Sequence, residues 1–487
     1  PDKKVTRRQV LRAAGVGTAA LVTAACSTSS EPSGTTTGSP AADGATASPG
    51  VSGAPALVTQ GETLRIALIG TSVGENFQKS ADLFTAKYPD VTVQFTPLQG
   101  ADWEAYFSKI LTSIAAGDVP DMTQVATEGT QLFAGQGLGA PLDDYVKRDA
   151  EAMQEFFSDV HPALIEGMMY EGSLYQLPVD FNCANMFFNM NLLTQAGLEL
   201  PPEEWTKDDF YTTVKQLTRR EPPQVFGYQW VNRLWGSWTP WIFVNASNLL
   251  VEERAPGGEW LWQTFYKDDP AAKGRGGGWR YPAPKANDPL NVEALEFIVQ
   301  LQREELTPMV DLGGGSSVQG FFTGGQLAMT PAGGFWAGGL HNAGMQPDAY
   351  DVQFFPRWKS QRHQFGAAGY VIFQQAKNKD LAWEFMKHSV SKEVMQIFFE
   401  GNPTTPTRRS MMTAERYAPT GPKNWQVFYD TLDRFPDTGP IPAPPESNPM
   451  TTIYTRYTGL AVTGEMQPKA ALDAMQADLE ALWAKRN

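Results

Sequence analysis

Cysteine and histidine are scarce in this chain of 487 residues. The two cysteines, Cys26 and Cys183, cannot form the disulfide framework of a stapled protein, so each needs its own explanation. The four histidines lie far apart and show neither the His-x-x-x-His nor the Cys/His spacing typical of a metal site. The sequence therefore predicts no disulfide scaffold, no metal centre and no cofactor.

Catalytic and nucleic-acid-binding patterns are also lacking. The sequence offers no recognisable set of nucleophile, base and orienting residue, so an enzyme is not expected. The formal net charge is −14 and Lys and Arg gather on no visible face, which argues against a nucleic-acid partner. One enzymatic alternative remains open, a glycosidase that uses Glu128 and Asp180 as its two carboxylates.

The first 26 residues are typical of an export signal. A basic start precedes a short apolar stretch over residues 13–25, which is too short to remain in a bilayer as a spanning helix. Residues 6–11 resemble a twin-arginine signal, and residues 24–26 resemble a lipobox in which Cys26 is acylated. Thr23 departs from the lipobox pattern, which usually has Leu, and an ordinary cleaved signal with an incidental cysteine is the alternative.

Residues 27–61 are rich in Ser, Thr, Gly, Ala and Pro and have almost no large apolar side chain. Such a segment cannot bury enough surface to fold, so it is predicted to be a disordered tether. The remaining length is enough for two or more domains with their own cores.

The folded part is predicted to begin with strands over 64–69, 91–95 and 122–125, separated by helices over 77–84 and 103–114. This alternation is typical of a parallel α/β lobe. Ligands bind such sheets beyond the carboxyl ends of the strands, which points to a loop over 126–128 that contains Glu128.

Residues 174–205 combine a bend, polar side chains and a buried strand. Pro178 interrupts regular pairing, Asp180 and Asn182 follow it, and 186–188 is an aromatic strand. A short helix, an Ala-Gly-Leu stop, two prolines and Trp205 complete the segment. In this order, the segment resembles the extracellular solute-binding proteins of carbohydrate ABC importers, the family that includes the maltodextrin-binding type.

This resemblance implies a two-lobed α/β fold of the type II periplasmic binding proteins, with three hinge crossings and a cleft between the lobes. It places lobe 1 over 62–181 and 364–404, and lobe 2 over 182–363 and 405–487. The crossings would be the Leu-Pro segment near 178, the strand over 366–373 and the segment 402–408. Residues 251–288 form an added loop or hairpin outside this pattern.

The predicted ligand contacts are of two kinds. Glu128, Asp180 and Asn182 would form hydrogen bonds, since carboxylates and amides suit vicinal hydroxyl groups. Aromatic side chains would stack on or edge the C–H faces of sugar rings, with packing in the core as the alternative. The aromatic candidates are Trp238, Phe335, Trp336, Tyr370 and Tyr454.

The resemblance implies that the protein captures an extracellular sugar or oligosaccharide and delivers it to the transmembrane subunits of an ABC permease. It would be a monomer, held by lipid alone on the outer face of the cytoplasmic membrane. The same scaffold could instead bind a polyol, a glycerol phosphate ester or a peptide, and a surface glycan hydrolase or adhesin is a further alternative. A phosphate would require a cationic side chain in the cleft, and Arg408 is the candidate.

Overall fold

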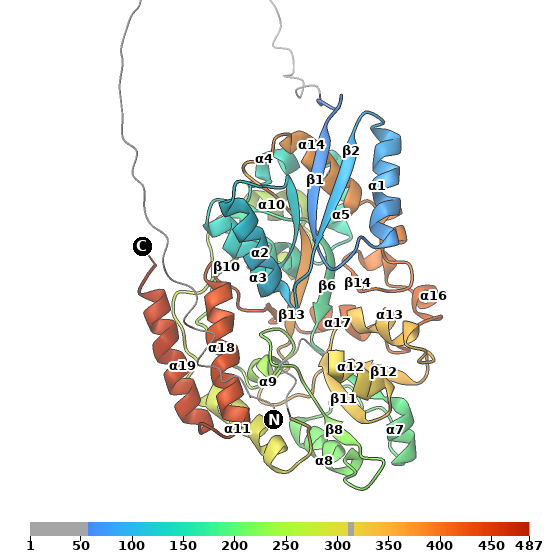
Figure 1. The fold of residues 1–487 in the computed structure, drawn as a ribbon, viewed down its shortest axis with the longest axis vertical. Helices are drawn as coiled ribbons and strands as arrows, with labels where there is room; N and C mark the ends of the chain where they lie inside the picture. Colours follow the sequence, from blue (N-terminus) through green and yellow to red (C-terminus); the bar gives the residue numbers. More distant parts are fainter. Residues whose placement is uncertain (1–56, 310–315, 487) are drawn as a thin grey trace, which may run out of the picture. The chain divides into compact units, whose positions relative to one another are not determined.

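The computed structural model of the chain describes residues 57–309 and 316–486 (Figure 1). The predicted export signal with Cys26, and the predicted tether up to residue 56, lie outside the described residues. Within the described part, the side chain of Leu57 already packs against a hydrophobic core, and Asn378 donates a hydrogen bond to the carbonyl of Val58. None of the described helices is both long enough and apolar enough to cross a membrane.

The first lobe is built on the predicted parallel strands. Strands β1 (Thr63–Ile69), β2 (Thr92–Leu98) and β3 (Met122–Ala126) pair in parallel in the order β3-β1-β2. Helices α1 (Glu75–Lys87) and α2 (Trp103–Ala115) connect them, and the carboxylate of Asp102 caps α2 by accepting from the amide of Ala105. The predicted alternation of strand and helix is confirmed here.

The three predicted crossings lie side by side in the same sheet. Strand β13 (Gln364–Ile372) pairs antiparallel with both β3 and β6 (Pro178–Cys183), and β14 (Thr405–Pro406) pairs with β6. The short strand β15 (Gly439–Pro440) pairs in parallel with the first two residues of β13. Because the crossings share backbone hydrogen bonds, they form one connected hinge.

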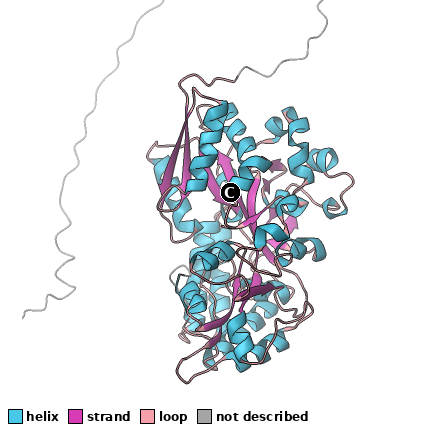
Figure 2. Ribbon diagram, turned by 90° about the vertical axis from the view of Figure 1, so that its right-hand side faces the viewer, coloured by secondary structure: helices cyan, strands magenta, loops and turns pink. Residues whose placement is uncertain are grey.

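The second lobe holds a smaller sheet in the order β12-β7-β11-β8. Strand β7 (Asn185–Asn189) is fully buried between β12 (Tyr350–Gln353) and β11 (Leu327–Ala332), and β8 (Phe226–Tyr228) forms the edge. Figure 2 shows the strands of each lobe enclosed by helices. Each lobe has its own large hydrophobic core, as expected for two lobes.

Helices cover both sheets. In the first lobe they are α3 (Thr127–Gly135), α4 (Asp143–Arg148), α5 (Ala150–Ser158), α6 (Pro162–Gly167), α14 (Lys379–Ser389) and α15 (Lys392–Phe398), with the small hairpin β4 (Met169–Tyr170) and β5 (Ser173–Leu174). In the second lobe and after the third crossing they are α7 (Met190–Gln195), α8 (Lys207–Leu217), α9 (Thr239–Val244), α11 (Pro289–Arg303), α12 (Ser316–Thr323), α13 (Phe335–Asn342), α16 (Ala414–Tyr417), α17 (Val427–Arg434), α18 (Ser447–Val462) and α19 (Pro468–Trp483).

The insertion over 251–288 contains a strand pair and a helix. Strands β9 (Glu253–Arg254) and β10 (Trp279–Arg280) pair antiparallel, and α10 (Glu259–Phe265) lies between them in the sequence. The insertion leaves from the second lobe after α9, yet Trp262, Phe265 and Tyr266 pack in the core of the first lobe, where the ring of Phe265 lies 4.1 Å from that of Phe157. It therefore connects the two lobes in addition to the three crossings.

Candidate ligand-binding site

A cavity of about 420 Å³ lies between the lobes, next to the crossings. The first lobe lines it with Trp103, Glu104 and Glu128, the crossings with Asp180, Asn182 and Gly366, and the second lobe with Arg233, Trp235 and Phe335. Its volume falls in the range of about 300–1,000 Å³ that is usual for small-molecule sites. A ligand held there would touch both lobes.

Glu128 reaches the cavity from the carboxyl end of β3. The sequence analysis placed this residue in a loop, but α3 begins already at Thr127, so Glu128 lies in the first turn of a helix. Its side chain is buried, and the hydroxyl of Thr127 donates to Oε2 at 3.1 Å. Burial raises the pKa of Glu128.

Asp180 and Asn182 point from β6 into a chain of hydrogen bonds that joins three segments. The amide of Phe335 donates to Oδ1 of Asn182 at 3.3 Å, and Nδ2 of Asn182 donates to the hydroxyl of Thr404 at 3.0 Å. That hydroxyl donates in turn to Oδ2 of Asp180 at 2.8 Å. Burial raises the pKa of Asp180 to about 6. The site thus couples the first crossing to the third crossing and to α13.

Glu104 adds a further carboxylate from the first turn of α2. Burial, together with repulsion from the neighbouring Glu128 and Asp102, raises its pKa to about 7. The hydroxyl of Thr451, from α18, donates to Oε1 of Glu104 at 3.1 Å. This contact joins the C-terminal helices to the first lobe beside the cavity.

Aromatic rings form the wall contributed by the second lobe. The rings of Trp235 and Phe335 lie 5.5 Å apart at 61°, and the guanidinium of Arg233 lies 5.5 Å from the Trp235 ring. A Cβ on Gly366 would lie only 3.0 Å from Nε1 of Trp235, so the indole packs directly on the crossing backbone. The cavity therefore offers carboxylates and an amide beside flat apolar surface.

Four of the eight predicted contact residues line the cavity: Glu128, Asp180, Asn182 and Phe335. The other four pack elsewhere in the described structure. The rings of Trp238 and Tyr454 stack on each other at 5.8 Å in the core of the second lobe. Trp336 packs against Phe187 and Phe322, and Tyr370 lies in the core of the first lobe.

The lining residues that were not predicted as ligand contacts include Trp103, Glu104 and Trp235. The first two lie in the first turn of α2, after the loop that follows β2, so the same rule about the carboxyl ends of parallel strands that identified Glu128 could have found them. Trp235 belongs to a cluster of four tryptophans between 230 and 241, from which Trp238 was chosen. Arg233 completes the second-lobe wall and was also missed.

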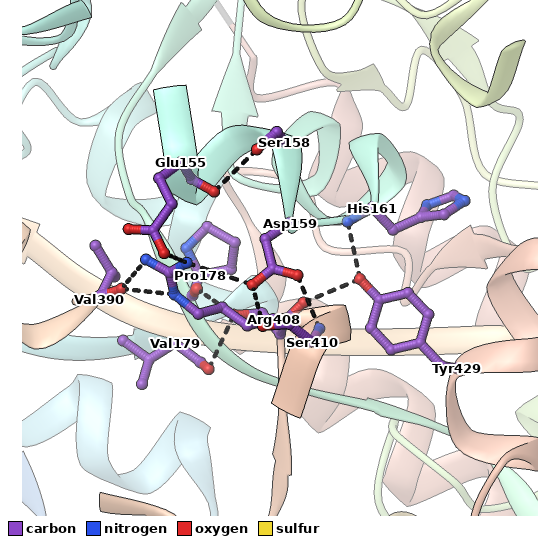
Figure 3. A network of polar contacts seen from close by, with 11 residues as sticks. Glu155, Ser158, Asp159, His161, Pro178, Val179, Val390, Arg408, Ser410 and Tyr429 are labelled. Carbon is purple, nitrogen blue, oxygen red and sulfur yellow. Dashed lines mark hydrogen bonds and ion pairs between the residues drawn. The ribbon is translucent and has the colours of Figure 1, made fainter. Parts of the chain in front are cut away.

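Arg408, the candidate for a phosphate contact, does not line the cavity. Its guanidinium is buried against the first lobe, where it donates to the carbonyl of Val390 at 3.0 and 2.9 Å and pairs with Asp159 at 3.3 Å (Figure 3). Next to it, the amide of Ser410 donates to Asp159, and the hydroxyl of Tyr429 donates to the carbonyl of Thr407. These bonds anchor the third crossing rather than a ligand.

One catalytic pattern, that of the serine hydrolases, was missed in the sequence. Residues 70–74 read Gly-Thr-Ser-Val-Gly between β1 and α1, which fits the Gly-x-Ser-x-Gly pattern. Ser72 is exposed, and in the described part of the chain it forms no hydrogen bond to a histidine. The pattern alone therefore does not indicate a catalytic triad.

Comparisons with known proteins agree with this architecture. A solved structure of an ABC substrate-binding protein from Listeria monocytogenes in complex with cycloalternan is 20% identical, with a TM-score of 0.71 over 87% of this chain and 100% of that one. This similarity shows the two-lobed fold of substrate-binding proteins.

Two curated relatives align over shorter stretches. A putative binding protein of Brucella abortus is 26% identical over 142 residues, which are 29% of this chain and 32% of the relative. A maltotriose-binding protein of Pyrococcus abyssi is 24% identical over 320 residues, 64% of this chain and 58% of the relative. The match thus spans about a third of the first of these relatives and a little over half of the second.

The family comparison covers most of the described chain. The family described as bacterial extracellular solute-binding protein matches residues 70–396, which include most of the first lobe after β1, the first two crossings and the sheet of the second lobe. By fold, by cavity and by this match, the chain belongs to the bacterial extracellular solute-binding proteins.

Proposed function

We propose that the protein captures a saccharide in the cavity between its lobes and delivers it to the transmembrane subunits of an ABC permease. The observation that carries this proposal is the composition of the cavity, which is lined by Asp180, Asn182 and Glu128 together with Trp235 and Phe335. Sugar rings need both features, since their hydroxyl groups form hydrogen bonds in the ring plane and their C–H faces pack on aromatic rings.

The relatives support the same class of ligand. The Listeria protein was solved with cycloalternan, and the Pyrococcus relative is a maltotriose-binding protein. We infer that this chain takes a small saccharide, because a cavity of about 420 Å³ suits one or a few sugar units.

The arrangement of the crossings supports a hinge mechanism. Asp180 and Asn182 lie on the first crossing, Thr404 lies beside the third, and Phe335 belongs to the second lobe. A ligand bound to these groups would contact both lobes at once and would favour the closed form, because only that form offers every contact.

The further properties proposed here follow from the sequence and the family. The protein is proposed to be exported, to be anchored by an acylated Cys26 outside the cytoplasmic membrane, and to act as a monomer that binds without cleaving its ligand. Mass spectrometry of the membrane fraction would test the anchor, because a diacylated cysteine adds the mass of its lipid chains.

A thermal-shift screen of the full chain tests the ligand class. The panel contains mono- and oligosaccharides, polyols, glycerol phosphate and short peptides, since a ligand that binds only the folded state raises the midpoint of unfolding. We expect a rise with one group of saccharides and no release of cleavage products. A rise with glycerol phosphate or peptides and none with saccharides would contradict the proposal, and cleavage products would indicate a hydrolase.

A further inference from the structure

Carboxylates outnumber cationic side chains strongly around the cavity. Asp102, Glu104, Glu128 and Asp180 line it, and among the described lining residues Arg233 is the one cationic side chain. The whole chain has 53 acidic and 39 basic residues, so its general acidity does not account for this local ratio. The excess is therefore a property of the cavity.

These carboxylates lie close enough to repel one another around the cavity. Glu128 and Asp102 both raise the pKa of Glu104, and Asp180 raises that of Glu128. Repulsion between like charges is large where burial lowers the local dielectric. The carboxylates come from α2, α3 and β6, three elements that the fold brings to one place.

Arg233 is oriented toward aromatic rings. Its Nε donates to the carbonyl of Trp235 at 2.9 Å, and its guanidinium lies 5.5 and 5.9 Å from the rings of Trp235 and Phe335. It lowers the pKa of Glu128, although burial is the dominant influence on that group and raises it. The cavity thus retains an excess of acidic side chains over cationic ones.

A metal ion does not fit this excess well. No group of three or more His, Cys, Asp or Glu side chains in the described residues is placed to hold a metal ion. The carboxylates are instead spread around a cavity with aromatic walls, and an ammonium group is attracted both to carboxylates and to the faces of Trp and Phe.

From this geometry we propose that the ligand is a saccharide that carries a protonated amino group. The inference rests on the proposed function, because it specifies the class of saccharide that enters the same cavity. The ammonium group lies among Glu104, Glu128 and Asp180, and the ring packs against Trp235 and Phe335. The hydroxyl groups of the sugar then use Asn182 and the remaining carboxylate oxygens.

Calorimetric titration of the full chain with three matched disaccharides tests the charge of the ligand. Diglucosamine carries two amines, N,N′-diacetylchitobiose has the same skeleton without charge, and cellobiose lacks the nitrogen. We expect diglucosamine to bind at least about tenfold more tightly than the other two, because charge-assisted hydrogen bonds are stronger than neutral ones. Spermidine is included as an amine without a sugar ring.

The pH dependence provides a second readout. Below about pH 6 the amines of diglucosamine are fully charged while Glu104 and Asp180 take up their remaining protons, so the affinity for diglucosamine falls between about pH 6 and about pH 4. The groups facing Glu104 are Asp102, Glu128 and the hydroxyl of Thr451, and Arg233 faces Glu128. Cellobiose carries no charge, so its affinity should not fall over the same pH range.

Single substitutions locate the effect. Glu104→Gln and Glu128→Gln keep the side-chain size and remove one charge, and each is expected to weaken diglucosamine binding by about tenfold. The control Glu296→Gln removes one charge from an exposed position on α11 that does not line the cavity. It should leave the affinity unchanged, and a thermal melt of each variant verifies folding.

Each other outcome contradicts a distinct statement. Cellobiose binding as tightly as diglucosamine would overturn the amino-saccharide inference and leave the saccharide proposal standing. Equal losses for neutral and charged sugars in Glu104→Gln and Glu128→Gln would show that these carboxylates act as ordinary acceptors, which also overturns the inference. Binding of spermidine alone, or of none of the probes, would overturn the inference, and the thermal-shift panel would then decide separately whether the proposed function stands.

Discussion

Trp235 and Trp238 lie three residues apart and have different surroundings. Trp235 lines the cavity, next to Phe335 and Arg233. Trp238 is fully buried, stacks on Tyr454 and donates from Nε1 to the hydroxyl of Thr458 at 3.0 Å. Affinity and stability should therefore depend on different tryptophans in the same segment.

Replacement of Trp235 by alanine should weaken saccharide binding by about 1–3 kcal/mol, the usual cost of losing an aromatic contact. Trp238→Phe is the control, because it should lower the free energy of unfolding without changing the affinity. Calorimetry and urea unfolding measure the two quantities separately. A loss of affinity in Trp238→Phe that equals the loss in Trp235→Ala would contradict this assignment.

The carboxyl of Glu104 makes stability depend on pH. Its pKa of about 7 in the folded state lies above the ordinary 4.5, so the folded protein holds a proton that the unfolded chain has lost between these values. The contribution of this group to stability therefore decreases as the pH rises through that window. His161 and His363 act in the opposite direction, because burial lowers their pKa to about 3 and about 4.

The variant Glu104→Gln separates these effects. The free energy of unfolding of the variant minus that of the wild type should grow by about 1–3 kcal/mol between about pH 4.5 and about pH 7.5, because only the wild type acquires a buried charge. Urea unfolding at several pH values in the absence of ligand measures it. A difference that does not change with pH would show that Glu104 titrates normally.

The sequence could predict Asp180 and Asn182, because a Leu-Pro bend followed by polar residues and a buried strand is a local pattern. It could not distinguish Trp235 from Trp238. The direction of each indole depends on the turn over 231–238, where Gly236 has a φ of +63°, and on packing with Tyr454, which lies more than two hundred residues away. Both causes belong to the tertiary structure.

At the scale of the secondary-structure elements, the first crossing lies in close contact with the residues at the start of α13. Two glycines precede α13, and a side chain would fit at neither: a Cβ on Gly333 would lie 2.6 Å from Cβ of Asn182, and one on Gly334 would collide with the hydroxyl of Thr405. The glycines allow the second lobe to contact two crossings.

The variant Gly333→Ala should lower both stability, by about 1–3 kcal/mol, and saccharide affinity, because the new methyl group displaces Asn182. Gly320→Ala is the matched control. Its Cβ would meet no atom within 4 Å on helix α12, so it should be neutral or stabilise the protein by up to about 1 kcal/mol. Full affinity in Gly333→Ala would contradict the role of this close contact.

The insertion is attached to the first lobe by buried charges. The fully buried Glu166 of α6 pairs with Arg254 and Arg275 of the insertion, both at 2.8 Å, and accepts from the amide of Gly276. The exposed pair between Glu171 and Arg280 joins the same two segments. The two pairs differ in burial, and this difference should decide how much each pair contributes to the free energy of unfolding.

The variant Glu166→Gln should lower the free energy of unfolding by roughly 3 kcal/mol, since it leaves the buried Arg275 without its charged partner. Glu171→Gln removes the exposed pair and should cost less than about 1 kcal/mol. Thermal and urea unfolding of both variants test the comparison. Equal losses would mean that the insertion is not held by the buried pair.

The regular elements of both lobes follow from local periodicity, which explains why the first five elements were predicted well. The insertion was foreseen only as a loop or hairpin. Helix α10 has seven residues, too few to show a helical pattern, and its aromatic side chains pack on α5, about a hundred residues earlier in the chain. Only the folded structure brings these partners together.

At the scale of the whole described body, two hydrophobic cores are joined by three crossings and the insertion. The cavity lies between the lobes: the first lobe and the crossings provide the carboxylates, an amide and Trp103, and the second lobe provides Trp235, Phe335 and Arg233. The resemblance predicted this two-lobed architecture, which the structural comparison shows. The balance of charges in the cavity depends on side-chain placement and could not be predicted.

The central claim is that a saccharide binds between the lobes and contacts both of them. A crystal structure of the protein grown with the saccharide that gives the largest thermal shift tests it most directly. The account predicts a sugar ring in the cavity, with hydroxyl or amino groups on Asp180, Asn182 and Glu128 and one face against Trp235. A saccharide bound at any other place, or one that touches a single lobe, would contradict the account.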